Sequence, residues 1–487
     1  MARMSRRVFL KSTAALVSTG ALAVACGAQP PSTPQAAQQS QTSGAAPEGG
    51  QATTSAPSVA QAPGAPAAGA PVPALLRSGN GEETFFNKTI DLFEKQHGDV
   101  KVNRIFVPGG SDYTTKLDLM IASGDPPAIY APFSDRGYRY YAARGLSQPL
   151  DDFVARDKFD LSDFHPDGMK GCRWQGKLMA LPLDLWPHLI FYNKTLFRAA
   201  GVPDLTMDWN DANWTTDEYL NLAQKLTKRD GNRVVQFGSD AYFNYWAAGW
   251  AFGGDWLPPE TYTTGIVSDF AGDKDPRVLA AVQWAADLML KHKVAPTPAQ
   301  TQQVQAGAPS LFMSGKIAMG INNIGQLSDY SKITAFEWGV APAPNPPNRE
   351  KRHLHVWIDF WSMIKGVKNL EGAWQLLKFM LSPEAQRIYP IQYGPMSARL
   401  SLGKDWMDVQ KGRLKLSPAE LNVMVEGPKH EQIDPENWTV NFSPINSQAL
   451  QPALDKIWLG DQTPADAIAK AAPAIRKLID ETKTVKK

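Results

Sequence analysis

The pattern of hydrophobic and polar positions changes repeatedly between a helical period and a strand-like period along residues 74–487. Three of the helical segments begin with good cap residues, namely Thr215, Asp275 before a proline, and Thr463 before a proline. Short apolar runs between the helices predict strands at 100–107, 128–131, 189–192, 234–238, 317–321 and 356–364. This alternation predicts α/β lobes with largely parallel sheets, and a chain of 487 residues is long enough for two lobes.

One predicted strand carries polar and aromatic side chains on a single face. In residues 183–192 the odd positions are apolar, whereas the even positions begin with Asp184, Trp186 and His188. A strand buried on both faces should not hold a carboxylate unless a partner satisfies it. We therefore expect this face to line a solvent-accessible space and the opposite face to belong to a hydrophobic core.

A second predicted strand with Trp and Asp side chains on one face occurs almost two hundred residues later. In residues 356–362, Trp357, Asp359 and Trp361 share one face, and the other face is apolar. One interpretation is that both segments bridge two lobes and turn their Trp and Asp side chains toward the cleft between them. The alternative is that each Trp packs under a covering helix and each Asp caps a helix.

Three weaker candidates lie elsewhere. Trp246 and Trp250 have i, i+4 spacing, which places them together on a helix, although such stripes usually belong to a core. Asn322 follows small residues on one face of a short strand. Small side chains there would allow a ligand to approach the strand closely, with the Asn322 amide next to it.

The amino-acid composition limits the classes of ligand that the protein is expected to bind. The formal net charge is +2, and it falls to −2 without the first 25 residues, which hold four basic and no acidic side chains. The sequence contains no run of basic residues of the kind that nucleic-acid-binding proteins carry. Fifteen tryptophans with scattered Asp and Asn suit a sugar, whose apolar face stacks on indole and whose hydroxyl groups bond to carboxylates and amides.

Enzyme and cofactor motifs are weak. The sequence has no zinc motif and no phosphate-binding glycine loop, so we expect neither a metal nor a cofactor. Cys172 has no surrounding signature and is expected to be a buried thiol. A secreted carbohydrate-active enzyme using Asp184 and Asp359 as its carboxylate pair remains an alternative.

The N-terminus is interpreted as an export signal followed by a tether. Residues 1–25 form a twin-arginine signal, with Ser5–Lys11 as its motif, and the small residues before Cys26 favour lipid attachment at that cysteine. Residues 26–73 are rich in Ala, Pro, Gln, Ser and Gly and are expected to be disordered. These features place the globular part outside the cytoplasmic membrane, in the periplasm or at the cell surface.

Several segments together resemble the sugar-binding cluster of ABC-importer solute-binding proteins, the group that includes maltose-binding protein. They occur in the order of that family and cover nearly all of residues 74–487. The segments are Ser123–Pro127, Gly145–Asp152, Gly176–Pro182, Phe191–Lys194, Trp214–Tyr219, Phe312–Met319 and Ala373–Met380.

The resemblance implies a two-lobed periplasmic-binding-protein fold of type II, with the ligand held between the lobes. Lobe 1 would comprise residues 74–184 and 362–432, and lobe 2 residues 185–361 and 433–487. Trp186 looks like a position that contributes to the sugar site. The family often has a cleft tryptophan near the place of Gly325 in this chain. It also has an aromatic-rich opening strand where this chain has Ser78–Gly81. The aromatic side chains that stack on a sugar must therefore come from other positions.

The expected function is that of a monomeric, non-catalytic receptor that delivers a carbohydrate to ABC permease subunits. Asn80 is a further candidate ligand contact. A polyol or phosphorylated polyol is the alternative ligand for the same importer class.

Overall fold

The computed structural model describes residues 69–79, 81–131, 137–243, 245–347, 354–392, 394–430 and 432–483. The candidate residues Cys26 and Asn80, together with the expected signal segment and most of the expected tether, lie outside these ranges. Among the residues described, no helix is both long and apolar enough to cross a membrane.

In chain order, the first part of the fold comprises β1 (Val72–Ser78), α1 (Glu82–Gln96), β2 (Val102–Pro108), α2 (Ser111–Ala122), β3 (Ile129–Tyr130), α3 (Tyr138–Ala143), α4 (Asp151–Asp157), α5 (Pro166–Gly171), β4 (Arg173–Trp174), β5 (Lys177–Leu178), β6 (Ala180–Asn193), α6 (Lys194–Ala199), α7 (Thr216–Leu226), β7 (Lys228–Asp230), β8 (Arg233–Gln236), η1 (Trp246–Trp250), α8 (Glu260–Thr264), α9 (Pro276–Leu290) and α10 (Pro298–Gln305).

The second part comprises η2 (Phe312–Ser314), β9 (Met319–Asn323), η3 (Ile324–Gln326), α11 (Leu327–Tyr330), β10 (Trp338–Ala341), β11 (His355–Met363), α12 (Leu370–Met380), α13 (Pro383–Gln392), β12 (Met396–Ser397), η4 (Leu400–Leu402), α14 (Gly403–Arg413), α15 (Pro418–Glu426), η5 (Gly427–His430), β13 (Gln432–Ile433), α16 (Pro435–Trp438), α17 (Phe442–Ile445), η6 (Asn446–Leu450), α18 (Gln451–Trp458) and α19 (Pro464–Thr482).

The predicted α/β class is confirmed, and so are the three helix starts. Thr215, Asp275 and Thr463 each accept a backbone N–H of the first turn of their helix, which satisfies a donor that has no partner within the helix. In α7 and α9 one apolar face of each helix is buried. Strand β1 begins at Val72, two residues before the expected start of the globular part; Val72 is buried and pairs with Val102 of β2.

The prediction of largely parallel sheets is wrong for most of the sheet. β1 pairs in parallel with β2 and β3, and a helix crosses over between each successive strand, as parallel pairing requires. The long strand β6, however, pairs antiparallel with β9, β10, β11 and β12. Alternating helices and strands specify a parallel sheet only where neighbouring strands follow one another in the chain, and the neighbours of β6 come from distant segments.

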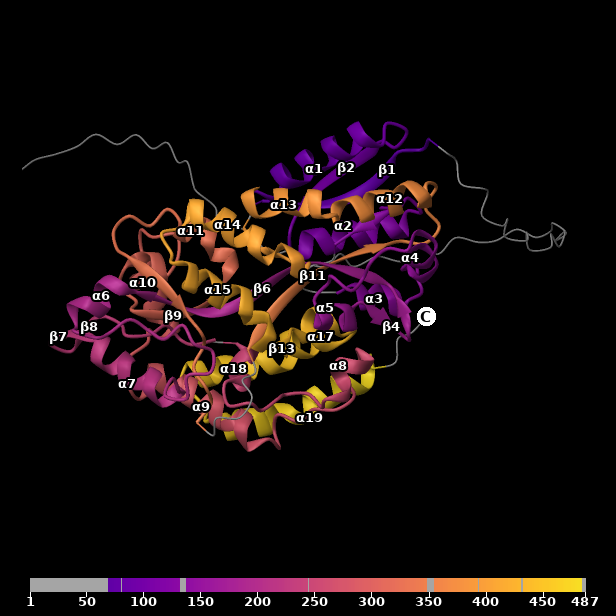
Figure 1. Cartoon of the computed structure of the whole chain (residues 1–487). Coiled ribbons are helices and arrows are strands. Elements are labelled where there is room, and N and C mark those ends of the chain that lie inside the picture. Colours follow the sequence, from indigo (N-terminus) through magenta and orange to yellow (C-terminus); the bar gives the residue numbers. More distant parts are fainter. Residues whose placement is uncertain are drawn as a thin grey trace, which may run out of the picture. The chain divides into compact units, whose positions relative to one another are not determined.

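β6 joins two groups of strands. Its first half pairs with β11 as far as Pro187, and its second half pairs with β9 from His188 onward and with β10 from Ile190. Figure 1 shows β6 and β11 side by side, with α1, α2, α12 and α13 around β1 and β2, and with α7 and α10 near β9. The final helices α18 and α19 pack on α9, so the chain returns to this second group at its end.

Candidate functional site

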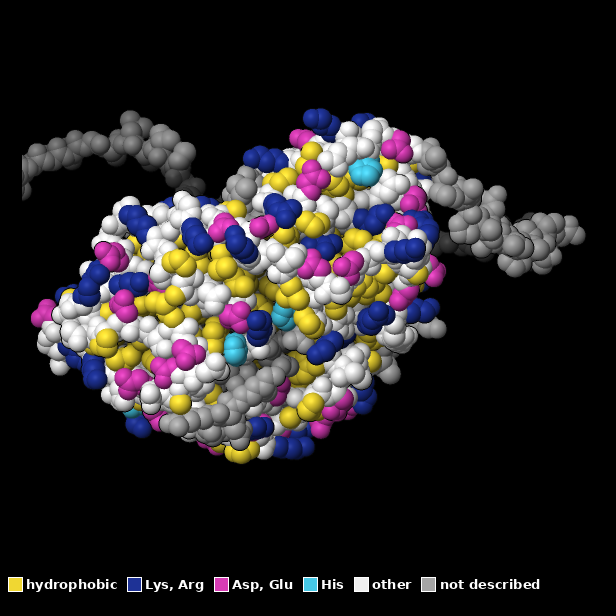
Figure 2. Space-filling view, in the orientation of Figure 1, with side chains coloured by type: hydrophobic (Ala, Val, Ile, Leu, Met, Phe, Trp, Pro, Cys, Tyr) yellow, Lys and Arg dark blue, Asp and Glu magenta, His cyan; other side chains and the backbone are white. Residues whose placement is uncertain are grey.

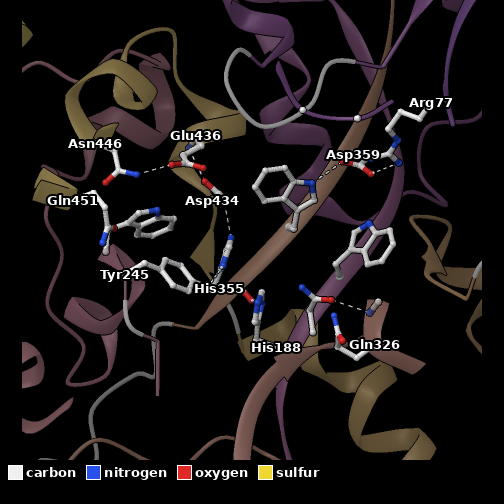
Figure 3. A pocket seen from close by; sticks show the side chains of 17 residues that line it. Arg77, His188, Tyr245, Gln326, His355, Asp359, Asp434, Glu436, Asn446 and Gln451 are labelled. Atoms are coloured by element: carbon white, nitrogen blue, oxygen red, sulfur yellow. Dashed lines mark hydrogen bonds and ion pairs between the residues drawn. The ribbon is translucent and has the colours of Figure 1, made fainter. Parts of the chain in front are cut away.

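A cavity of about 650 Å³ opens where β6 and β11 run side by side (Figure 3). Its wall combines residues from both strand groups and from the last third of the chain. The lining residues are Arg77, Gly109, Gly110, Trp186, His188, Tyr245, Trp246, Asn323, Gly325, Gln326, His355, Trp357, Asp359, Asp434, Glu436, Asn446 and Gln451. A volume of this size is typical of small-molecule sites, which span roughly 300–1,000 Å³.

Two tryptophan–aspartate pairs lie at the cavity floor, where Trp186, Trp357 and Asp359 line the cavity and Asp184 is buried behind them. Trp186 donates its indole N–H to Asp184 over 2.7 Å, and Trp357 donates to Asp359 over 2.7 Å. The two tryptophans are direct partners in the antiparallel β6–β11 ladder, and so are the two aspartates, which lie two positions before Trp186 on β6 and two positions after Trp357 on β11. Side chains two positions apart share a face of a strand, which is why each aspartate reaches its own tryptophan.

These hydrogen bonds decide what the indoles present to the cavity. An indole has a single donor, its N–H, and in both rings that donor points to a carboxylate of the protein. The rings therefore offer carbon edges and π faces to a ligand. Only a small part of Trp186 is exposed, whereas Trp357 is partly exposed.

Three charged side chains form a buried cluster beside these pairs. Arg77 makes an ion pair with Asp359 at 2.9 Å and with Glu82 at 2.5 Å. Burial raises the pKa of Glu82 to about 7, although the Arg77 charge opposes this shift. Burial also raises the pKa of Asp359, again against the effect of Arg77. The positive charge of Arg77 is thus already compensated by protein carboxyl groups.

A histidine pair lies next to the aromatic floor. The rings of His188 and His355 stack at 4.5 Å between centroids, and Nδ1 of His188 lies 2.6 Å from the His355 carbonyl oxygen and donates to it. Burial lowers the pKa of both imidazoles, which favours neutral rings. A neutral His355 with its proton on Nε2 donates to Asp434 at 2.6 Å and accepts the Tyr245 hydroxyl at Nδ1 over 3.1 Å.

The far side of the cavity is polar and comes from the C-terminal segment. Asn446 donates its amide to Glu436 over 2.8 Å, and Asn446 begins a single π-helical turn, η6, with Gln451 directly after it. Such turns are rare and often occur at functional sites. Figure 3 shows Glu436, Asn446 and Gln451 opposite Arg77 and Asp359.

Five of the residues singled out from the sequence line this cavity. They are Trp186, His188, Trp246, Trp357 and Asp359. The sequence reasoning placed them on two strand faces and one aromatic helix, and the β6–β11 ladder and the turn η1 bring them together.

Four other candidates do not line the cavity. Asp184 and Trp361 are both fully buried. The Phe86 ring of α1 packs against Trp361 in a T-shaped arrangement, with 5.8 Å between ring centroids. Trp250 packs against Trp246 with 4.7 Å between ring centroids, but it does not itself line the cavity. Asn322 donates to the Tyr330 hydroxyl, so the next residue, Asn323, lines the cavity instead.

Sequence reasoning missed the polar wall. The missed lining residues include Arg77, Tyr245, Gln326, His355, Asp434, Glu436, Asn446 and Gln451. Two of them carried a usable signal, because Tyr245 precedes Trp246 and His355 lies two positions before Trp357 on the same strand face. The others come from a strand and from short helical segments elsewhere in the chain, whose approach to the cavity no local pattern reveals.

The buried position of Asp184 also bears on the enzyme alternative. A glycosidase needs two carboxyl groups that flank a glycosidic bond from the two sides of a cleft. Asp184 lies below the cavity floor, and its Oδ1 accepts the backbone N–H of Asp359, so these two residues do not form such a pair. In the part of the chain that the structure describes, no cluster of three or more His, Cys, Asp or Glu residues could hold a metal ion.

Comparison with known proteins gives consistent matches. The family model of the bacterial extracellular solute-binding protein matches residues 78–387. A binding protein of Brucella abortus (strain 2308) is 25% identical over 409 residues, which cover 81% of this chain and 90% of the relative. The structure of maltose-bound MalE3 from T. maritima is similar with a TM-score of 0.64 and 21% identity, over 84% of this chain and 99% of that chain.

A further solved structure, UgpB from Mycobacterium tuberculosis in complex with glycerophosphocholine, gives a TM-score of 0.66 at 17% identity, over 85% of this chain and 99% of that chain. These structural similarities show a shared two-lobed α/β fold. The family match spans well over half of the chain and agrees with the resemblance found in the sequence. The chain therefore belongs to the bacterial extracellular solute-binding protein family, whose members bind solutes for ABC importers.

Proposed function

We propose that this protein captures a carbohydrate, either a monosaccharide or an oligosaccharide, and delivers it to the permease of an ABC importer. The observation that carries the proposal is the pair of neighbouring indole rings, Trp186 and Trp357, whose N–H groups are held by carboxylates at the floor of an open cavity. Rings fixed in this way present π faces, on which the C–H face of a pyranose stacks.

The surrounding groups suit the hydroxyl groups of a sugar. Asn323 accepts the Gly325 N–H with its Oδ1, which leaves the donors of its amide directed elsewhere, and Gln326 and Glu436 also line the cavity. Because Arg77 is paired with Asp359 and Glu82, the site favours a neutral ligand over a phosphorylated polyol. On the face shown in Figure 2, acidic and basic side chains are interspersed, without a region of one sign.

The proposed mechanism is closure of two lobes around the ligand. We assign residues 74–184 and 362–432 to one lobe and residues 185–361 and 433–487 to the other. The strand partners of β6 change at 187–188, close to the assigned boundary at 184–185, which supports a crossing in this strand. A ligand that contacts both lobes binds the closed form more tightly and so shifts the population toward it. The permease would then recognise the closed form.

The N-terminal segment supplies the proposed location. Residues 1–25 would direct export by the twin-arginine route, Cys26 would carry the lipid, and residues 26–73 would tether a monomeric globule outside the cytoplasmic membrane. Metabolic labelling with a palmitate analogue tests the anchor. Label incorporated into the wild-type chain and lost in Cys26→Ser supports it, whereas equal label in both contradicts it.

A ligand screen tests the function. Thermal unfolding would be measured with mono- and oligosaccharides, polyols and glycerol 3-phosphate, because a ligand that binds only the folded state raises Tm. We expect a saturable shift with a saccharide and no reaction products. A shift with glycerol 3-phosphate alone would replace the proposed ligand class, and product formation would replace the receptor by an enzyme.

A further inference from the structure

Asp184 is a buried carboxyl group that joins the cavity floor to a helix outside the cavity. Its Oδ1 accepts the Trp186 indole N–H at 2.7 Å and the Asp359 backbone N–H at 3.3 Å. Its Oδ2 accepts the hydroxyl of Tyr389 at 2.5 Å. Tyr389 lies on α13, 205 residues further along the chain, and does not line the cavity.

Tyr389 is itself held firmly. Its side chain is fully buried, and its ring packs against Phe85 of α1 with 4.3 Å between centroids. α13 contacts both α1 and α14, so the hydroxyl projects from a packed layer of helices. A donor fixed in this way limits the positions that the Asp184 carboxyl group can take.

Trp186 needs such a constraint because its other edge is in close contact with the backbone. A Cβ atom added to Gly325 would lie 2.6 Å from Cζ3 of Trp186, so the six-membered ring rests directly against that glycine. The N–H edge is then the only part of the ring that a polar partner can hold, and Asp184 holds it from below, with Asp359 also in hydrogen-bonding reach.

We propose that Tyr389 is a positioning residue for ligand binding, acting through Asp184 to set the orientation of the Trp186 ring in the cavity. The importance of that ring for a ligand rests on the proposed function, but the positioning itself does not. The relay tolerates either protonation state of Asp184, because a hydroxyl group donates to a carboxylate and accepts from a carboxylic acid.

The experiment observes Trp186 in the ligand-free protein. The globular chain with its native tether is labelled with ¹⁵N-tryptophan, and the Trp186 indole N–H resonance is the one lost in Trp186→Phe. Tyr389→Phe keeps the ring and its packing on Phe85 but removes the hydroxyl. We expect this variant to shift the Trp186 resonance and to speed the hydrogen exchange of its N–H by roughly 2- to 10-fold, the effect of one lost hydrogen bond.

The matched control is Tyr141→Phe, which removes another buried tyrosine hydroxyl that donates to a carboxylate, Asp118 at 3.2 Å, outside the cavity. It should leave the Trp186 resonance unchanged at a comparable loss of Tm. Asp184→Asn provides an independent variant of the same size and should move the same resonance. The proposal is overturned if Tyr389→Phe and Asp184→Asn leave the shift and exchange of Trp186 as in the wild type, whatever ligand the protein binds.

Discussion

The Trp186 ring occupies the space that a side chain at position 325 would need. A Cβ atom on Gly325 would stand 2.6 Å from Cζ3 of Trp186 and 2.7 Å from Oδ1 of Asn323, both closer than real Cβ contacts. The glycine at this place therefore has a steric reason, and the aromatic ring that lines the cavity here is Trp186 on β6.

Gly325→Ala should weaken ligand binding, because the added methyl group must push Trp186 or Asn323 out of place. Overpacking of this kind typically costs about 1–3 kcal/mol of folding stability as well. Calorimetry with the saccharide found in the screen, together with thermal unfolding, measures both effects. Gly412→Ala is the control, since a Cβ atom there meets nothing within 4 Å and the residue lies in a helix. Equal affinity in Gly325→Ala and the wild type would contradict the role assigned to Trp186.

Two tryptophans on the same face of β11 should behave in opposite ways. Trp357→Ala should lose about 1–3 kcal/mol of ligand binding with a modest loss of stability, because the ring is partly exposed in the cavity. Trp361→Ala should lose about 3–5 kcal/mol of stability, because its fully buried ring leaves a hole beneath α1. Urea unfolding and calorimetry separate the two losses. A reversed pattern would show that the ligand does not use this cavity.

Glu82 should make folding stability depend on pH. Burial raises its pKa from 4.5 to about 7, so the folded state binds the proton more tightly than the unfolded state does. The stabilisation is complete below about pH 4.5 and is lost as the pH rises through 7. Glu82→Gln removes this titration and should gain stability relative to the wild type between pH 4.5 and 7.5, by at most about 3 kcal/mol.

Urea unfolding at several pH values measures the Glu82 effect. Glu83→Gln changes the neighbouring, exposed glutamate and is the matched control for the same substitution on the first turn of α1. The explanation fails if the difference between Glu82→Gln and the wild type is constant with pH.

Cys172 should be unreactive in the native protein. Its side chain is fully buried, and burial raises the pKa of the thiol well above its ordinary value, which suppresses the reactive thiolate. In a Cys26→Ser variant, iodoacetamide at pH 8 should leave the chain unmodified until denaturant is added, as mass spectrometry would show. Rapid modification without denaturant would contradict this prediction and would mean that the structure around Cys172 opens easily in solution.

The sequence alone determined the features that depend on local geometry. Period-two alternation in β6 and β11 placed Trp186 and His188 on one face and Trp357 and Asp359 on another, because successive side chains of a strand point to opposite sides. The helix starts at Thr215, Asp275 and Thr463 also followed from local hydrogen bonding. The segments that resemble the solute-binding family, which occur in the same order as in that family, indicated the fold class.

Tertiary structure decided which side chains on those faces meet open space. Trp361 and Asp184 share faces with lining residues, yet α1 covers the first and Tyr389 of α13 bonds to the second. The polar wall with Glu436 and Asn446 comes from a segment far along the chain. Alternation along a strand fixes the side to which a residue points, whereas its cover is set by long-range packing that no local pattern encodes.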